Sequence, residues 1–327
     1  MLNKKGTASK KCLGAVPLTP LNVCVNMKRL FSIALLITVV LQLFACNSLN
    51  QELPNNTRIR LGLDKYDDWG NEAVAFIKPD EEYVIYIPKI AILDTGCNLN
   101  SNMVLPGHNV LDNSQNISDT DGHGTLVTGK LISLVVNAEI IPIKIAESEN
   151  IEHSSLSNGL KKAISFQPDI ISLSLGTQIN YQDIANIIRD AIDRGIIIIA
   201  AAGNQYGTEL LFPAAYDGVI SVIARDINNM DCAYNNKSKE KRSFSAPGEH
   251  IMVEDEYMSG SSIAVSYVTA LISQMLAITG KNKLLSSDEI MKILSETALY
   301  PTKCSYGLIQ YEASISKLYS RIRKEER

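Results

Sequence analysis

Five predominantly apolar runs of strand length constrain the fold of this chain more than any other feature. A strand with one face in water alternates apolar and polar side chains, so runs that stay apolar indicate strands covered on both faces, as in a parallel sheet. Helical patterns separate the runs, and this alternation predicts an α/β domain with a mostly parallel central sheet covered by helices on both faces. The expected strands are residues 90–93, 140–145, 170–175, 196–201 and 219–224, and the expected helices are residues 124–136, 156–166, 181–194, 263–278 and 288–298.

Composition supports a globular protein and argues against one class of partner. Of the 327 residues, 46% are hydrophobic, which is enough to bury a sizeable core and excludes a disordered polymer. The formal net charge is −4 and the pI is about 5.7, the opposite of the basic surface that phosphate recognition needs. We therefore expect no nucleic-acid partner.

The first 45 residues have the organisation of a secretory signal. They contain six basic residues and no acidic residue, and an apolar stretch at residues 30–45 directly follows Lys28 and Arg29. A basic region, an apolar core and a small residue before a cleavage point are the parts of such a signal. Because Met27 directly precedes the basic pair, translation is predicted to begin there. The alternative is an uncleaved anchor, although the stretch is shorter than the roughly 20 residues of a membrane span.

The end of this signal region resembles the lipobox of bacterial lipoproteins, in which a cysteine is lipidated and becomes the mature N-terminus. The resemblance rests on residues 43–46, Leu-Phe-Ala-Cys, and makes Cys46 the candidate lipidation site. It implies that the body of the protein is held at the outer face of the cytoplasmic membrane, with simple secretion as the alternative. We expect a polar tether at residues 46–60, a globular domain at residues 61–316, and a charged tail at residues 317–327 that ends a solvated helix.

Three short stretches place a reactive side chain beside glycine at a strand end or a helix start. Asp94 ends the first expected strand, His123 lies between two glycines where a helix begins, and Ser262 begins the most apolar expected helix. Each has an ordinary explanation on its own, because Asp-Thr-Gly is a common turn and serine is a good helix cap. Their order along the chain, however, is one of three orders in which serine proteases carry their Asp, His and Ser.

Asn204 follows the strand expected at residues 196–201 and lies between the His and the Ser in chain order. An asparagine at a strand end is often only a turn former. Hydrolysis through a serine also needs a hydrogen-bond donor for the oxygen that becomes negative in the tetrahedral intermediate. Asn204 is therefore the candidate for that donor.

Taken together, these motifs resemble those of the subtilisin family of serine proteases (subtilases, peptidase family S8) over roughly residues 90–313. Residues 245–248 and 306–309 resemble two further landmarks of the family. The resemblance implies a subtilisin-like three-layer fold and a serine endopeptidase that acts on peptide substrates. It also implies site residues, which are the triad Asp94, His123 and Ser262, the oxyanion donor Asn204, and the substrate-binding strand Ser174, Leu175 and Gly176.

No cofactor or metal ion is expected. Many subtilases bind calcium in a loop before the second core strand, but the corresponding link here, residues 133–138, is too short to supply six to eight oxygen ligands. The cysteines of the globular domain, Cys97, Cys232 and Cys304, are spaced too widely for a zinc site or a disulfide framework.

Three hypotheses about the biological role remain open, because specificity is not encoded in catalytic motifs. The segment before the core is short for a prodomain, and a compact, surface-tethered subtilase resembles the peptidases that remove leader peptides from lantibiotic and related bacteriocin precursors. The alternatives are a general extracellular degradative protease and a catalytically silent binding protein. The first side-chain pocket is expected near residues 200–204 and 208–213, with either an apolar wall or Glu209 to receive a basic residue. We expect a monomer.

Overall fold

The computed structural model describes residues 69–79, 83–148, 150–207, 209–280 and 285–325. The predicted signal region (1–45), the tether (46–60) and the candidate lipidation site Cys46 lie outside the described residues.

In the described part of the chain, an eight-stranded sheet has the order β10-β7-β6-β5-β4-β1-β3-β2, and all its neighbouring strands are parallel. The strands are β1 (Lys89–Asp94), β2 (His108–Asn109), β3 (Glu139–Lys144), β4 (Ile170–Leu173), β5 (Ile197–Ala201), β6 (Ile220–Arg225), β7 (Ser243–Pro247) and β10 (Ser305–Leu308). The five expected strands are confirmed as β1, β3, β4, β5 and β6. The predicted parallel α/β architecture is confirmed with them.

Strands that lack a long apolar run were not expected from the sequence. They are the two edge strands β2 and β10, the inner strand β7, and the antiparallel pair β8 (Ile251–Val253) and β9 (Glu256–Met258). In β7 the buried side chains include Ser243 and Ser245, so hydropathy does not separate this strand from a loop. Only its pairing with β6 and β10 identifies it as part of the sheet.

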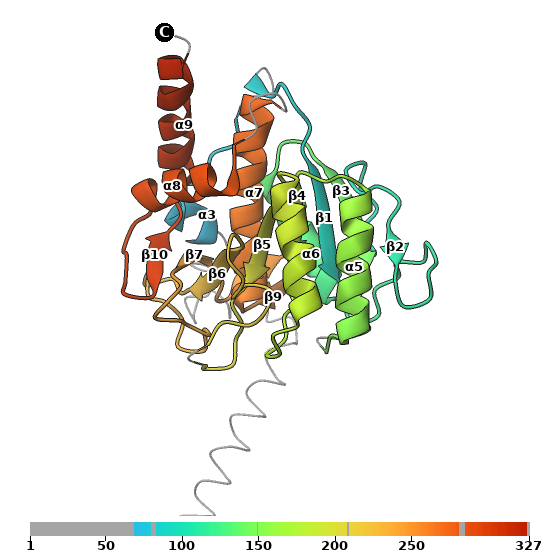
Figure 1. Ribbon diagram of the computed structural model, residues 1–327. Helices are drawn as coiled ribbons and strands as arrows, with labels where there is room; N and C mark the ends of the chain where they lie inside the picture. Colours follow the sequence, from blue (N-terminus) through green and yellow to red (C-terminus); the bar gives the residue numbers. More distant parts are fainter. Residues whose placement is uncertain (1–68, 80–82, 149, 208, 281–284, 326–327) are drawn as a thin grey trace, which may run out of the picture. The chain divides into compact units, whose positions relative to one another are not determined.

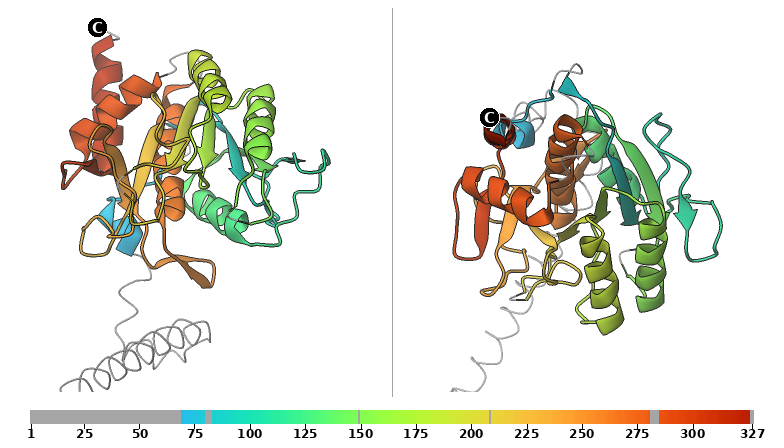
Figure 2. Two further views of the ribbon diagram at one scale, coloured as in Figure 1. Left: turned by 60° about the horizontal axis from the view of Figure 1, so that its bottom comes forward. Right: turned by 45° about the horizontal axis from the view of Figure 1, so that its top comes forward.

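Helices cover both faces of the sheet (Figures 1 and 2). They are α3 (Trp69–Ala73), α4 (His123–Leu134), α5 (His153–Ser165), α6 (Gln182–Asp193), α7 (Ser261–Thr279), α8 (Ser287–Thr297) and α9 (Tyr311–Glu325). Side chains along a strand point to alternate faces, so neighbouring residues of β1 enter different cores. Ile90 and Ile92 pack in the core that contains α4 and α7, whereas Ala91 and Leu93 pack in the core that contains α5 and α6.

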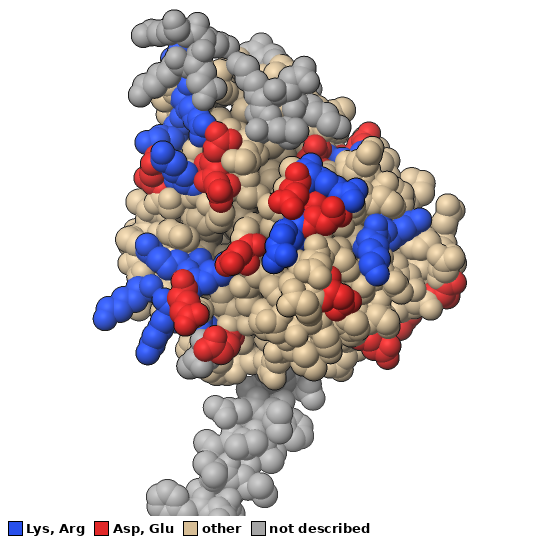
Figure 3. Space-filling model, viewed as in Figure 1, with Lys and Arg blue, Asp and Glu red and all other residues tan. Residues whose placement is uncertain are grey.

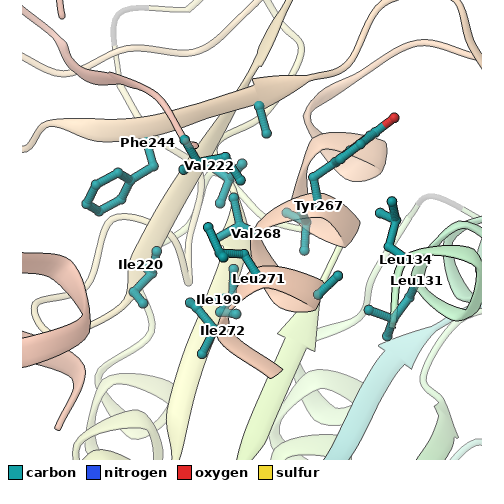
Figure 4. Close-up of a cluster of buried hydrophobic side chains, with 14 of the residues drawn as sticks. Leu131, Leu134, Ile199, Ile220, Val222, Phe244, Tyr267, Val268, Leu271 and Ile272 are labelled. Atoms are coloured by element: carbon teal, nitrogen blue, oxygen red, sulfur yellow. The ribbon is translucent and has the colours of Figure 1, made fainter. Parts of the chain in front are cut away.

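All 19 residues of α7 are buried, and its apolar side chains fill the core between the sheet and α4 (Figure 4). Among the described helices, α7 is the one long and apolar enough to cross a membrane, but its burial identifies it as a core helix. Two of its polar side chains donate hydrogen bonds across the core to α4. Ser266 Oγ donates to the Val127 carbonyl at 3.0 Å and Gln274 Nε2 to the Leu134 carbonyl at 3.0 Å. These bonds fix α7 against α4, the two helices whose N-termini carry His123 and Ser262.

The C-terminal region forms a helical pair. Helix α8 begins with a capping box, in which Ser286 Oγ accepts from the Glu289 N–H and the Glu289 carboxylate accepts from the Ser286 N–H. The residues expected as a charged tail continue α9 as far as Glu325, and ion pairs join α9 to α8. These pairs are Lys317–Glu296 and Arg321–Glu289.

Surface charges of both signs are mixed on the face of the molecule shown in Figure 3, and Lys and Arg side chains gather at its lower left. The exposed ion pairs of the described residues include Arg194–Asp190 at 2.8 Å. Such exposed pairs contribute little to stability, typically about 0.2–1 kcal/mol each. These exposed pairs therefore do little to specify the fold.

Candidate active site

The residues singled out in the sequence converge at one edge of the sheet. Asp94 is the last residue of β1, Ser174 directly follows β4, and Asn204 lies three residues after β5. Because β1, β4 and β5 are parallel and adjacent, their carboxyl ends meet at the same edge, which is where α/β proteins place ligands. His123 and Ser262 are brought to this edge by the N-termini of α4 and α7.

A hydrogen-bonded pair of a buried carboxylate and a part-buried imidazole lies at this edge. His123 Nδ1 lies 2.7 Å from Asp94 Oδ1, and the exposed fractions of the two side chains are 12% and 1%. The Thr95 N–H also donates to Asp94 Oδ1, at 2.8 Å, so the carboxylate is held from its own strand end. A hydrogen bond of this kind orients the imidazole and stabilises its protonated form.

Backbone conformation and close packing explain why glycines flank His123. Gly122 precedes α4 with a φ of 94°, which lets the chain turn into the helix at little cost. A Cβ at Gly124 would lie only 2.3 Å from the Gly96 carbonyl oxygen. The first turn of α4 therefore packs directly on the end of β1, and this close approach places His123 beside Asp94.

Asp119 holds the start of α4, a role that was not predicted from the sequence. Its carboxylate accepts hydrogen bonds from the Gly122 N–H at 2.9 Å, from the Thr125 N–H at 2.8 Å and from Thr125 Oγ1 at 2.6 Å. Burial would raise the pKa of Asp119, but these hydrogen bonds outweigh burial and lower it. The charged carboxylate thus satisfies free N–H groups of the helix that carries His123.

The hydroxyl of Ser262 lies against the end of β4. Ser262 Oγ donates to the Ser174 carbonyl at 2.8 Å, and Ser174 Oγ donates back to the Ser262 carbonyl at 3.1 Å. Ser262 is buried, with an exposed fraction of 8%. This exchange of hydrogen bonds places the expected substrate-binding strand, of which Ser174 is the first residue, directly beside the hydroxyl.

Hydrogen bonds to its amide oxygen orient the side chain of Asn204. Its Oδ1 accepts from the Ser261 N–H at 2.8 Å and from Ser261 Oγ at 2.9 Å. An N–H group must face an acceptor, so this contact fixes which end of the amide is the oxygen. The NH2 group of exposed Asn204 is then the end directed away from Ser261. Ser261 orients Asn204, a contact that depends on the fold and that the sequence did not reveal.

Lys144 supports the chain segments on either side of the Asp94–His123 pair. It ends β3 opposite Asp94 in the register, and its buried Nζ donates to the Thr95 carbonyl at 2.7 Å and the Ser118 carbonyl at 3.0 Å. Its third contact is an ion pair of 2.9 Å with the exposed Glu147. Lys144 therefore ties the chain after Asp94 to the chain that leads to His123.

We expect Lys144→Met to lower the free energy of unfolding by about 3 kcal/mol, because it leaves the buried Thr95 carbonyl and the Ser118 carbonyl without their charged donor. Urea unfolding measures this loss. Lys161→Met, at an exposed lysine of α5, is the control and should change stability by less than about 0.5 kcal/mol. Equal stability of the two variants would contradict the role given to Lys144.

No group of three His, Cys, Asp or Glu side chains that could hold a metal ion occurs among the described residues. The expectation of no calcium at residues 133–138 stays a prediction, which melting curves with and without a chelator test.

Cys97, Cys232 and Cys304 are free thiols in the structure. Burial raises the pKa of the Cys97 thiol, which lies close to the site, and makes it a poor nucleophile.

Known proteins resemble this chain in sequence and in fold. The family model described as the subtilase family (Peptidase S8) matches residues 88–317. The major intracellular serine protease of Bacillus subtilis (strain 168) is 29% identical over 245 residues, covering 64% of this chain and 75% of that protein. Subtilisin BL of Lederbergia lenta is 26% identical over 231 residues, covering 64% of this chain and 82% of that protein. The solved protease domain of PatA matches with a TM-score of 0.62 and 20% identity, covering 75% of this chain and 98% of that chain, which supports the fold.

Proposed function

Because this chain belongs to the subtilase family and is a serine endopeptidase, we propose that Asp94, His123 and Ser262 are its catalytic triad. The observation that carries the proposal is the hydrogen bond of 2.7 Å between His123 Nδ1 and the buried Asp94 Oδ1, at the sheet edge where Ser262 also lies. A hydrogen-bonded Asp–His pair beside a serine hydroxyl is the arrangement that activates a serine as a nucleophile.

The hydrolysis then proceeds in two steps. His123 takes the proton of Ser262 Oγ as the oxygen attacks the scissile carbonyl, and later gives it to the leaving amine, while Asp94 stabilises the imidazolium. Water completes the second step by hydrolysing the acyl-enzyme. The Asn204 NH2 group and the backbone N–H of Ser262 stabilise the oxyanion, helped by the positive end of the α7 dipole.

Substrate binding is expected to release the nucleophile. Ser262 Oγ donates to the Ser174 carbonyl in the structure, and a peptide that adds as a strand along Ser174, Leu175 and Gly176 would donate its own N–H to that carbonyl. The Ser262 hydroxyl then loses its acceptor and is free to turn toward His123. Strand pairing and nucleophile activation are coupled in this way.

Asn204→Ala is expected to lower kcat by about 10²–10³-fold with little change in KM, because the oxyanion exists only after attack. Steady-state kinetics on one peptide measures both constants. Asn186→Ala, at an exposed asparagine on α6, is the control with unchanged kcat. A loss of less than threefold at Asn204 would mean that other groups supply the donor.

We further propose that the enzyme removes leader peptides from a lantibiotic or related bacteriocin precursor rather than degrading proteins generally. The packing of Leu211 described below supports restricted specificity. Incubation with a defined precursor and with casein distinguishes the roles, since a processing enzyme cleaves one bond in the precursor and leaves casein intact. Rapid digestion of casein would favour the degradative role, and failure to react with a fluorophosphonate would favour a silent binding protein.

The cell-surface location is also a proposal, and it rests on the sequence around Cys46 alone. Lipidation there would hold the enzyme on the outer face of the membrane, where an exported precursor passes. Mass spectrometry of the mature N-terminus tests this directly. A mature chain that begins well beyond Cys46 would contradict the lipid anchor.

A further inference from the structure

We propose that Leu211 fills the space for the substrate side chain that precedes the scissile bond, so that this enzyme cleaves only after a small residue such as glycine or alanine. That substrate residue is called P1 below. The inference deepens the proposed function and depends on it, because it takes Ser262 as the nucleophile and Asn204 as the oxyanion donor.

The position of P1 follows from the contacts of the site. A peptide that pairs with Ser174, Leu175 and Gly176 lies along the end of β4, and its scissile carbonyl must reach Ser262 and Asn204 at the same time. The end of β4 and the end of β5 therefore flank P1 on its two sides. The P1 side chain enters the gap between these two chain ends, which are marked by Gly176 and Gly203.

Leu211 occupies this gap. A Cβ added at Gly176 would lie 3.0 Å from Leu211 Cβ, and a Cβ added at Gly203 would lie 2.7 Å from Leu211 Cγ. The leucine side chain is thus in contact with both glycines and is only 8% exposed. The absence of side chains at the two glycines leaves space between the strand ends, and the side chain of Leu211 fills that space.

The backbone on both sides of Leu211 is fixed by hydrogen bonds. The Leu211 N–H donates to the Ala202 carbonyl at 2.9 Å, and Phe212 and Thr177 exchange two backbone hydrogen bonds of 2.8 Å. The segment from Leu211 to Phe212 is in this way a short connection between the ends of β5 and β4.

Lys241 fixes the residues that follow. Its Nζ donates to the carbonyls of Ala214 and Tyr216, and Asn236 Nδ2 donates to the Glu209 carbonyl on the other side of the segment. Withdrawal of Leu211 from the gap would break several of these bonds together. The space for P1 is therefore small before the substrate arrives, and it stays small.

These contacts decide between the two alternatives for the P1 pocket, an apolar wall or Glu209. Glu209 is exposed, whereas Leu211 is buried between the glycines, so the apolar alternative fits the structure. A leucine or phenylalanine at P1 would overlap the Leu211 side chain, while glycine and alanine add at most one carbon. Even one methylene group more or less in such a space changes kcat/KM by about 10–200-fold.

The experiment compares peptides that differ only at P1, with alanine or phenylalanine there. The wild-type enzyme should prefer alanine by about 100-fold in kcat/KM. Leu211→Ala should bring phenylalanine to within about tenfold of alanine. Leu285→Ala removes the same atoms from a leucine that is also 8% exposed, in the core beside α7, and should leave the P1 preference unchanged.

Titration with a fluorophosphonate counts the active enzyme in each preparation, so that a partly unfolded variant is not mistaken for a slow one. Leu211→Val is the milder variant if Leu211→Ala does not fold, and it should relax the preference in the same direction. Wild-type enzyme that cleaves after phenylalanine as readily as after alanine would overturn this inference and leave the peptidase assignment intact. A wild-type enzyme that neither cleaves nor reacts with the fluorophosphonate would overturn both.

Discussion

Replacing Ser262 with alanine is expected to lower kcat for peptide hydrolysis by about 10⁶-fold, the magnitude known for loss of the nucleophile in subtilisin. The side chain that attacks the carbonyl is then absent, and no acyl-enzyme forms. The fold should persist, because the substitution removes one oxygen whose hydrogen bond goes to a single carbonyl, that of Ser174. Turnover of a peptide substrate and labelling by a fluorophosphonate both measure the effect.

Ser273→Ala is the matched control, because Ser273 is a buried serine on the same helix. It should keep the labelling and the turnover that Ser262→Ala loses. Unchanged turnover in Ser262→Ala would refute the triad, even if the family membership of the chain stands.

Replacing Asp94 with asparagine is expected to lower kcat by about 10⁴-fold. If the amide oxygen keeps the place of Oδ1 beside Thr95 and His123, the charge that stabilises the imidazolium is gone. The NH2 group then lies where Oδ2 is, a buried atom without a hydrogen-bond partner among the described residues. If the amide turns round, it presents an N–H to His123 Nδ1 and favours the tautomer that cannot accept the Ser262 proton.

Both orientations therefore impair proton transfer, and steady-state kinetics with a thermal unfolding control separates this effect from misfolding. Asp193→Asn, at an exposed aspartate that ends α6, provides the matched isosteric change and should leave kcat unaltered. A loss smaller than tenfold in Asp94→Asn would show that Asp94 does not assist His123.

The proposed catalytic groups were recognisable from the sequence because their signals are local. A buried strand that ends in Asp94, a histidine between two glycines and a serine at the start of an apolar helix each need only a few neighbouring residues. The glycine after the histidine is required sterically, since a Cβ at Gly124 would collide with the Gly96 carbonyl oxygen. The strands β1, β3, β4, β5 and β6 were predictable for a similar reason, because burial on both faces demands an unbroken apolar run.

The supporting contacts were not predictable, because they join residues far apart in the chain that carry no local signal. In the sequence Asp119 is an ordinary polar loop residue. Only the structure shows that its carboxylate accepts a hydrogen bond from the first turn of α4. Lys144 lies inside an apolar run, and Ser261 is only a serine next to another serine. Their roles appear when the sheet brings three strand ends together.

Chemistry and specificity are thus encoded at different levels in this protein. Local sequence is sufficient to single out the proposed nucleophile, base and carboxylate, since each must occupy a particular type of chain end. The size of the P1 space is decided by Leu211 fitting between Gly176 and Gly203, residues that meet only in the folded chain. The space left for a substrate side chain depends on the volumes of side chains from several chain segments. No short sequence motif specifies that space.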